Sequence, residues 1–158
     1  MGVTRSVEWV QARDPQDDPE YTHRLVRPLF VAFPELEAPF HADVADWTPG
    51  TGGRYSLYPF FFNVFDVALR RVLAGEEPAE RMDALFSWLE DLALLGRAEA
   101  ARDGDRYLDF FLMTEVMEEI AKHPAGVELC RTRMGPACVQ LFVESEAKQG
   151  ITEHLPFP

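Results

Sequence analysis

Apolar residues recur every three or four positions along most of the chain, which is the spacing of one face of an α-helix. Patterns that alternate as a β-strand would are nearly absent. Together with proline, glycine and capping signals, the spacing predicts helices over residues 19–33, 36–46, 56–74, 79–95, 103–122, 125–133 and 136–149. The sequence therefore predicts an all-α single domain of about five to seven helices over residues 1–158.

Breaks in the helical pattern define the remaining segments. Residues 1–17 form a lead-in, residues 48–55 a glycine-rich loop, and residues 151–158 a proline-bearing tail. Asp18-Pro19 and Ser56 are typical helix starts. Gly96 is expected to end or loosen the helix over 79–95, because glycine disfavours a helix interior.

The helix over residues 56–74 is apolar nearly all round, which predicts burial in the core. The residues expected to be buried there are Phe60, Phe61, Phe62, Val64, Phe65, Val67, Ala68, Leu69 and Val72. The same aromatic side chains could instead line a pocket.

A short internal match suggests how the helices are arranged. Residues 89–93 and 117–121 both read apolar, acidic, acidic, apolar, alanine, and both are expected near a helix end. Successive helices with short linkers favour stacked antiparallel hairpins. A short α-solenoid and an irregular bundle both fit this pattern.

The charge is strongly negative and unevenly distributed. The chain of 158 residues has a formal net charge of −12, and residues 76–122 hold 13 acidic and 5 basic residues. This balance argues against binding nucleic acid or an anionic membrane surface, since both need clustered basic residues. It favours a partner protein with a basic surface.

Five carboxylates in this segment are the candidate partner-binding residues: Glu90, Asp91, Glu115, Glu118 and Glu119. At helical spacing, the last three share one side of their helix. Glu118 is placed to pair with Lys122, four residues later. A plain solvated face and a metal or acid–base site are the alternatives.

Motifs for catalysis are missing. The chain has no Gly-x-Ser-x-Gly, no His-Glu-x-x-His and not the two Glu-x-x-His motifs that a di-iron bundle needs, and the loop at residues 48–55 lacks the Lys-Ser/Thr ending of a phosphate-binding loop. Cys130 and Cys138 lie on apolar stretches, where free thiols tend to be inert. The sequence therefore predicts no catalytic residue, no metal ligand and no cofactor. Two free thiols and the lack of an apolar run long enough to span a bilayer favour a cytoplasmic protein.

Residues 60–146 resemble a group of small bacterial helical proteins that look like truncated α-solenoids, some of them similar to immunity proteins of toxin systems. The resemblance is carried by the motifs Leu85-Phe86, Leu89-Glu90-Asp91-Leu92, Glu115-Val116-Met117-Glu118 and Met134-Gly135-Pro136. It implies a helical fold and a protein partner, and no catalytic residues.

Three functional hypotheses follow. The first is an immunity or antitoxin-type inhibitor that masks a basic surface of its partner with an acidic helical face. The second is a small-ligand-binding protein or enzyme with a pocket between the helix over residues 56–74 and its neighbours. The third is a structural adaptor without a charge-driven partner.

Overall fold

The N-terminal helices begin where the capping residues predict. The computed structural model describes residues 15–150. After a 3₁₀ turn at Pro15–Asp17, α2 spans Pro19–Val26, and the Asp18 side chain accepts the N–H of Glu20 at 3.2 Å. The helix expected over residues 19–33 is shorter than predicted, because the chain continues as 3₁₀ helix over Arg27–Val31. Pro28 explains the change, since proline disfavours α-helix at the residue before it.

The loop at residues 48–55 connects the next two helices. Helix α3 spans Glu37–Trp47, as predicted. A 3₁₀ turn at Pro49–Thr51 follows, and Gly52 and Gly53 then adopt positive φ angles of 69° and 83°. These are backbone conformations that glycine adopts without steric cost. The chain next enters α4 at Leu57–Phe60, with the Ser56 side chain accepting the N–H of Tyr58.

Two of the predicted helices contain a stretch of π-helix. The first runs through α4, a π segment at Phe61–Phe65, and α5 at Asp66–Leu73. The second runs through α7 at Tyr107–Phe111, a π segment at Leu112–Met117, and α8 at Glu118–Ala121. A π segment has more residues per turn than an α-helix, so it shifts which side chains face the core.

These two helical stretches run side by side in the same direction. The Tyr107 hydroxyl accepts the N–H of Leu57 at 3.1 Å near their starts, and the rings of Phe61 and Phe111 meet edge to face at 6.1 Å. Arg70 reaches Glu119 near their ends. The two π segments therefore lie at similar levels of neighbouring helices.

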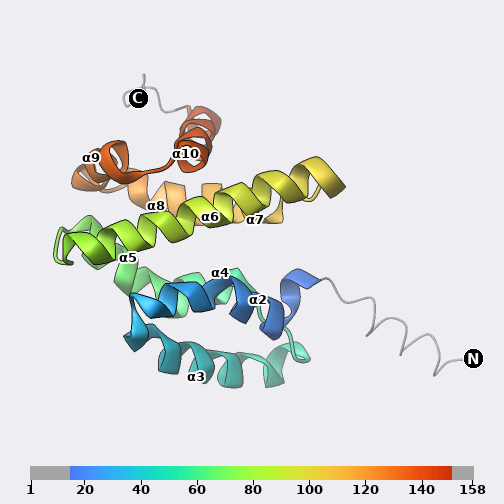
Figure 1. Ribbon diagram of the computed structural model, residues 1–158. Helices are drawn as coiled ribbons and strands as arrows, with labels where there is room; N and C mark the ends of the chain where they lie inside the picture. Colours follow the sequence, from blue (N-terminus) through green and yellow to red (C-terminus); the bar gives the residue numbers. More distant parts are fainter. Residues whose placement is uncertain (1–14, 151–158) are drawn as a thin grey trace, which may run out of the picture.

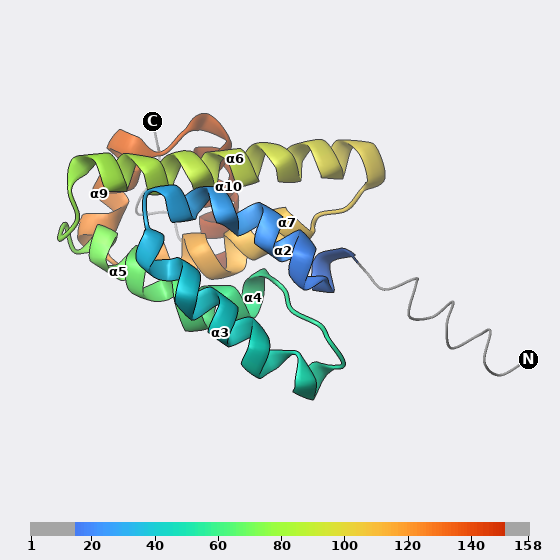
Figure 2. The ribbon, with the colours of Figure 1, turned by 60° about the horizontal axis from the view of Figure 1, so that its bottom comes forward.

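Helix α6 is the central element and is longer than predicted. It spans Ala79–Asp103 and passes through Gly96 without a break. Figure 1 shows α6 across the middle of the molecule, with α9 (Pro124–Arg133) and α10 (Pro136–Gln149) on one side and α2 to α5 on the other. The turned view in Figure 2 brings forward α3, which lies on the far side of α2 and α4 from α6.

Gly96 serves close helix packing rather than helix termination. A Cβ atom added at residue 96 would lie 2.7 Å from Oδ1 of Asp109 and 3.0 Å from Cβ of Leu108. Such distances are shorter than van der Waals contact, so only glycine lets α7 approach α6 this closely.

A single hydrophobic core joins these helices, and the chain folds as an all-α single domain, as predicted. The helix with the most aromatic residues is not buried all round, however. Phe60, Phe61 and Phe65 are buried, whereas Phe62 and Val67 are 60% and 63% exposed. The prediction that these last two are buried is wrong, because one side of this helix is left uncovered.

The five-residue match is not a structural repeat. Residues 89–93 lie in the middle of α6, and residues 117–121 cover the last π-helical residue and α8. The expectation that both copies lie near a helix end is therefore wrong for the first.

Candidate functional site

Many acidic residues of the 76–122 segment are engaged within the molecule. Glu77 is buried and pairs with Arg71 at 3.0 Å and with Arg81 at 3.4 Å. Asp83 pairs with Arg133. The segment is therefore far less available to a partner than its formal charge indicates.

The candidate residue Glu90 has an internal partner. Its carboxylate accepts the N–H of Ala137 at 2.8 Å and the N–H of Cys138 at 3.0 Å. Both N–H groups belong to the first turn of α10, where donors have no acceptor within the helix and a negative charge is favourable. The neighbouring candidate, Asp91, is exposed and has no ion pair with any described residue.

Glu119 is also neutralised. Its carboxylate lies 3.3 Å from Lys122, 3.3 Å from His123 and 3.9 Å from Arg70. Burial by itself would raise the pKa of Glu119, but the hydrogen bonds from His123 and Lys122 and the charges of Lys122 and Arg70 hold that pKa below its usual value.

The expected pairing of Glu118 with Lys122 is wrong. Lys122 lies just beyond the last residue of α8, and its ammonium contacts Glu119 instead. The ideal helical spacing that predicts the i,i+4 pair does not extend past the helix end.

Glu115 and Glu118 are the two candidates that remain together without a cation. Neither forms an ion pair with a described residue, and the charge of Glu118 acts on Glu115. Burial raises the pKa of Glu115, a hydrogen bond from Thr114 opposes the rise, and the nearby Glu118 charge adds to it. The site thus holds two like charges whose mutual repulsion is only partly relieved, by the more distant Lys122.

Aromatic residues of the same and the neighbouring helical stretch lie close to this carboxylate pair or about one turn from residues that do. Burial raises the pKa of Tyr58, and the nearby Glu115 charge adds to the rise. A side-chain hydrogen bond with Thr114 opposes it. Phe62 follows Tyr58 by about one turn and is 60% exposed. Phe110 is 45% exposed, and its carbonyl accepts the Thr114 hydroxyl at 2.7 Å.

We call this surface the aromatic–acidic face, defined by six residues from the two neighbouring helical stretches. They are Tyr58, Phe62, Phe110, Thr114, Glu115 and Glu118. The sequence identified its two acids but placed Phe62 in the core.

The interior around the aromatic helix is filled. The Phe60 ring stacks on the Phe65 ring at 5.9 Å, and Trp88 meets both rings at 6.4 and 5.3 Å. Phe60 and Phe65 are at most 1% exposed. This packing counts against the expected ligand pocket between residues 56–74 and their neighbours.

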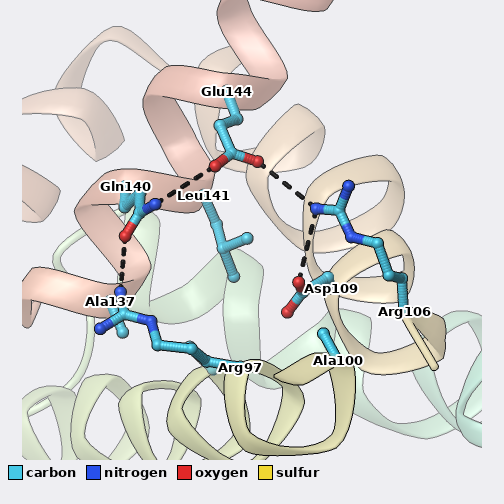
Figure 3. A pocket seen from close by; sticks show the side chains of 9 residues that line it. Arg97, Ala100, Arg106, Asp109, Ala137, Gln140, Leu141 and Glu144 are labelled. Atoms are coloured by element: carbon cyan, nitrogen blue, oxygen red, sulfur yellow. Dashed lines mark hydrogen bonds and ion pairs between the residues drawn. The ribbon is translucent and has the colours of Figure 1, made fainter. Parts of the chain in front are cut away.

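A polar pocket lies instead where α10 meets α6 and the start of α7 (Figure 3). Its volume is about 250 Å³, and it is lined by Ala93, Arg97, Ala100, Arg106, Asp109, Ala137, Gln140, Leu141 and Glu144.

The polar lining forms one connected chain of contacts, drawn as dashed lines in Figure 3. Arg97 donates to the Gln140 side-chain oxygen at 2.6 Å, and the Gln140 amide donates to Glu144 at 3.4 Å. Arg106 then lies 3.6 Å from Glu144 and 3.4 Å from Asp109. The pocket therefore offers cationic and anionic groups side by side.

No pattern in the sequence predicts this pocket. Its polar residues come from three helices and share no motif spacing, so only the folded chain brings them together. Gly96 is the sequence feature most directly related to the pocket, because its lack of a side chain leaves room for Asp109.

A second cavity, of about 400 Å³, lies between the end of α5 and α9. Its lining is mostly apolar and comprises Leu73, Ala74, Gly75, Ala125, Glu128, Leu129 and Thr132. This lining offers Glu128 as its single charged group, so it presents little recognition chemistry.

Within residues 15–150, no three His, Cys, Asp or Glu side chains gather closely enough to hold a metal ion. The Cys138 side chain is buried. None of the helices described here has both the length and the apolar character that crossing a bilayer requires.

Comparison with known proteins adds no relative. No protein-family model, no curated protein and no solved structure matches the chain, so the resemblance to toxin-immunity proteins stays a prediction.

Proposed function

We propose that this protein binds a partner protein with a basic surface through the aromatic–acidic face. The carrying observation is the pair Glu115 and Glu118, which lie together without an ion-pair partner among the described residues. Nearby acids of the same segment, Glu119 among them, have basic partners. The pair is thus available to a cation from outside the chain, and unlike the single unpaired acid Asp91 it places two carboxylates together.

The energetics favour a cationic partner at this position. Like charges one helical turn apart destabilise a helix by a few tenths of a kcal/mol in water. A partner's arginine or lysine would turn that repulsion into attraction. Because Glu115 is half-buried, the attraction would be less screened by solvent than one between two exposed side chains.

Phe62 and Phe110 supply contact area for the same partner. Aromatic side chains, phenylalanine among them, are enriched in protein–protein interfaces, and they attract cations to their ring faces. Phe110 already lies under the cations of Arg106 and Lys148, at 5.3 and 5.1 Å from its centroid. Phe62 has no cation over its ring among the described contacts and is free to receive one.

The π segments support the choice of this face. Both lie under it, at Phe61–Phe65 and Leu112–Met117. Segments of π-helix are often found at functional sites, where they turn particular side chains outward.

We further infer the biological class from the resemblance and the charge together. A cytoplasmic bacterial immunity or antitoxin-type inhibitor would mask a basic active surface, such as that of a nuclease, with an acidic helical face. Electrostatic attraction would also speed association with such a partner.

Affinity capture with charge-reversed variants tests the proposal. The wild-type protein, a Glu115→Lys/Glu118→Lys variant and a Glu20→Lys/Asp46→Lys control serve as baits in extracts of the source cell. Glu20 and Asp46 are exposed acids on α2 and α3, so the control changes the net charge by the same amount. We expect a basic partner that the wild type and the control retain, and that the Glu115/Glu118 variant loses.

The outcome also separates the alternatives. Retention of every partner by the Glu115/Glu118 variant would refute the proposal. A partner lost with Phe62→Ser, but bound equally at low and high salt, would favour a structural adaptor.

A further inference from the structure

The charges in the polar pocket do not balance locally. Arg97 donates to the neutral Gln140 amide and has no carboxylate partner among the described residues. Asp109 and Glu144 share one guanidinium, that of Arg106, at distances of 3.4 and 3.6 Å. One end of the pocket therefore has a cation without an anion, and the other has two anions for one cation.

A ligand that completes this pattern carries both charges. Its carboxylate would satisfy Arg97, and its ammonium group would satisfy Glu144. Arginine suits the first contact because its guanidinium can bind a carboxylate with two parallel hydrogen bonds.

Gln140 indicates how far apart the two ligand charges must be. Its side-chain oxygen accepts from Arg97 at 2.6 Å, and its side-chain nitrogen donates to Glu144 at 3.4 Å. An acceptor and a donor joined through a single carbon thus span the two groups. In an α-amino acid two carbons, the carboxylate carbon and Cα, separate the acceptor oxygens from the ammonium nitrogen, which is only one carbon more than in the amide.

The rest of the lining limits the size of the ligand. The volume of about 250 Å³ lies below the range of roughly 300–1,000 Å³ that is typical of pockets for drug-sized molecules. Ala93, Ala100, Ala137 and Leu141 supply the apolar part of the wall. A short apolar side chain fits this wall better than a charged one.

We propose that the pocket between α6, α7 and α10 binds a free α-amino acid, with its carboxylate on Arg97 and its ammonium group on Glu144. The Gln140 amide is displaced toward solvent when the ligand takes over its two contacts. This site shares no residue with the aromatic–acidic face, although its Arg106 lies over the ring of Phe110, and it does not depend on the proposed partner.

Titration calorimetry on the full chain tests the proposal with defined probes. Each common α-amino acid is titrated, followed by the N-acetyl derivative and the methyl ester of any that binds. We expect saturable binding of at least one amino acid with a small apolar side chain. The derivatives, which each lack one charge, should bind at least about tenfold more weakly, because each loses a charged hydrogen bond.

Variants place the ligand in the pocket. Arg97→Gln and Glu144→Gln should each weaken binding about tenfold or more, whereas Arg27→Gln, at an exposed arginine outside the pocket, should leave it unchanged. Thermal unfolding of each variant checks that it is folded. The Gln140 side-chain amide resonance should also shift on addition of the ligand in the wild-type protein.

Three results would overturn the proposal. The first is the absence of binding by any α-amino acid up to about 10 mM. The second is equal binding of the N-acetyl derivative, which would make the pocket a simple anion site. The third is unchanged affinity in both pocket variants, which would place the ligand elsewhere.

Discussion

The carboxylate of Glu90, in the middle of α6, caps α10 by accepting the N–H of Ala137 at 2.8 Å. The second carboxylate oxygen accepts the N–H of Cys138 at 3.0 Å. Gly135 makes the approach possible, since a Cβ atom at that residue would lie 2.4 Å from the Glu90 carboxylate. Glu90, 47 residues before Ala137, thus caps α10 in place of a local side chain.

Replacing Glu90 should therefore destabilise the fold. Glu90→Ala leaves two helix-terminal N–H groups without their acceptor, which costs about 1–2 kcal/mol in the free energy of unfolding. Urea denaturation measures this change. Asp91→Ala is the matched control: Asp91 is exposed and unpaired among the described residues, so its change should stay within about 0.5 kcal/mol. Equal effects of the two substitutions would contradict the capping role.

Gly96→Ala should lower stability, although alanine is the better helix former by about 1 kcal/mol. The new Cβ atom would lie 2.7 Å from Oδ1 of Asp109 and 3.0 Å from Cβ of Leu108, which forces α7 away from α6. We expect a loss of about 1–3 kcal/mol, measured by chemical denaturation. Gly50→Ala should be nearly neutral, because no atom lies within 4 Å of a Cβ placed there. A stabilised Gly96→Ala variant would show that the two helices can separate without cost.

The buried carboxylate of Glu77, just before α6, lies 3.0 Å from Arg71 of α5 and 3.4 Å from Arg81 of α6. Glu77→Gln leaves Arg71 without a carboxylate partner and Arg81 with Glu35 alone, which should cost about 1–3 kcal/mol in the free energy of unfolding. The adjacent Glu76→Gln provides the control, since Glu76 is exposed and forms no ion pair with a described residue. If thermal melts of the two variants coincide, the Glu77 contacts contribute nothing to stability.

Local signals predicted the helix boundaries well. Asp18 caps α2, Ser56 caps α4, Pro136 begins α10, and Gly150 adopts the left-handed conformation that ends it. Each of these residues acts on a backbone group a few positions away, so its effect can be read from neighbouring residues. The 3₁₀ stretch that follows α2 also has a local cause, Pro28, but the apolar spacing over residues 19–33 is the same for a helix that continues and does not reveal the change.

Contacts between distant residues could not be predicted in this way. The continuous pattern of apolar residues gave no sign that Phe62 faces outward, because which side of that helix is covered depends on α7 and α8. Gly96 looked like a helix end, and only the approach of Asp109 explains it. In the pocket, Arg97 and Gln140 meet because α10 crosses α6, and no spacing in the sequence encodes that crossing.

The like-charge pair on the aromatic–acidic face should lower the free energy of unfolding of the unbound protein. The pKa of Glu115 is raised, by burial first and by the Glu118 charge as well. A group with a raised pKa in the folded state makes the fold less stable as pH increases through that pKa. Glu115→Gln should therefore increase the free energy of unfolding at pH 7 by a few tenths of a kcal/mol. That gain should disappear when the pH is lowered until the carboxyl group is protonated in both states.

Glu119→Gln provides an internal control of opposite sign. The pKa of Glu119 is lowered, so its ionised form stabilises the fold at neutral pH, and that contribution is lost as the pH falls through the folded-state pKa. Glu119→Gln should therefore destabilise the protein at pH 7, with an effect that fades on acidification. Urea denaturation of both variants between pH 3 and 8 measures the two trends. Parallel curves for the two variants would show that the neighbouring charges do not act as described.

The same two variants connect stability with binding. If a partner's cation occupies the aromatic–acidic face, Glu115→Gln should bind that partner more weakly while being more stable by itself. Functional sites often retain such unfavourable arrangements, because the partner relieves them. Glu119 already has its own cations, so Glu119→Gln should weaken partner binding less than Glu115→Gln does. A Glu115→Gln variant that is more stable and binds its captured partner as well as the wild type would mean that the carboxylate pair simply faces water.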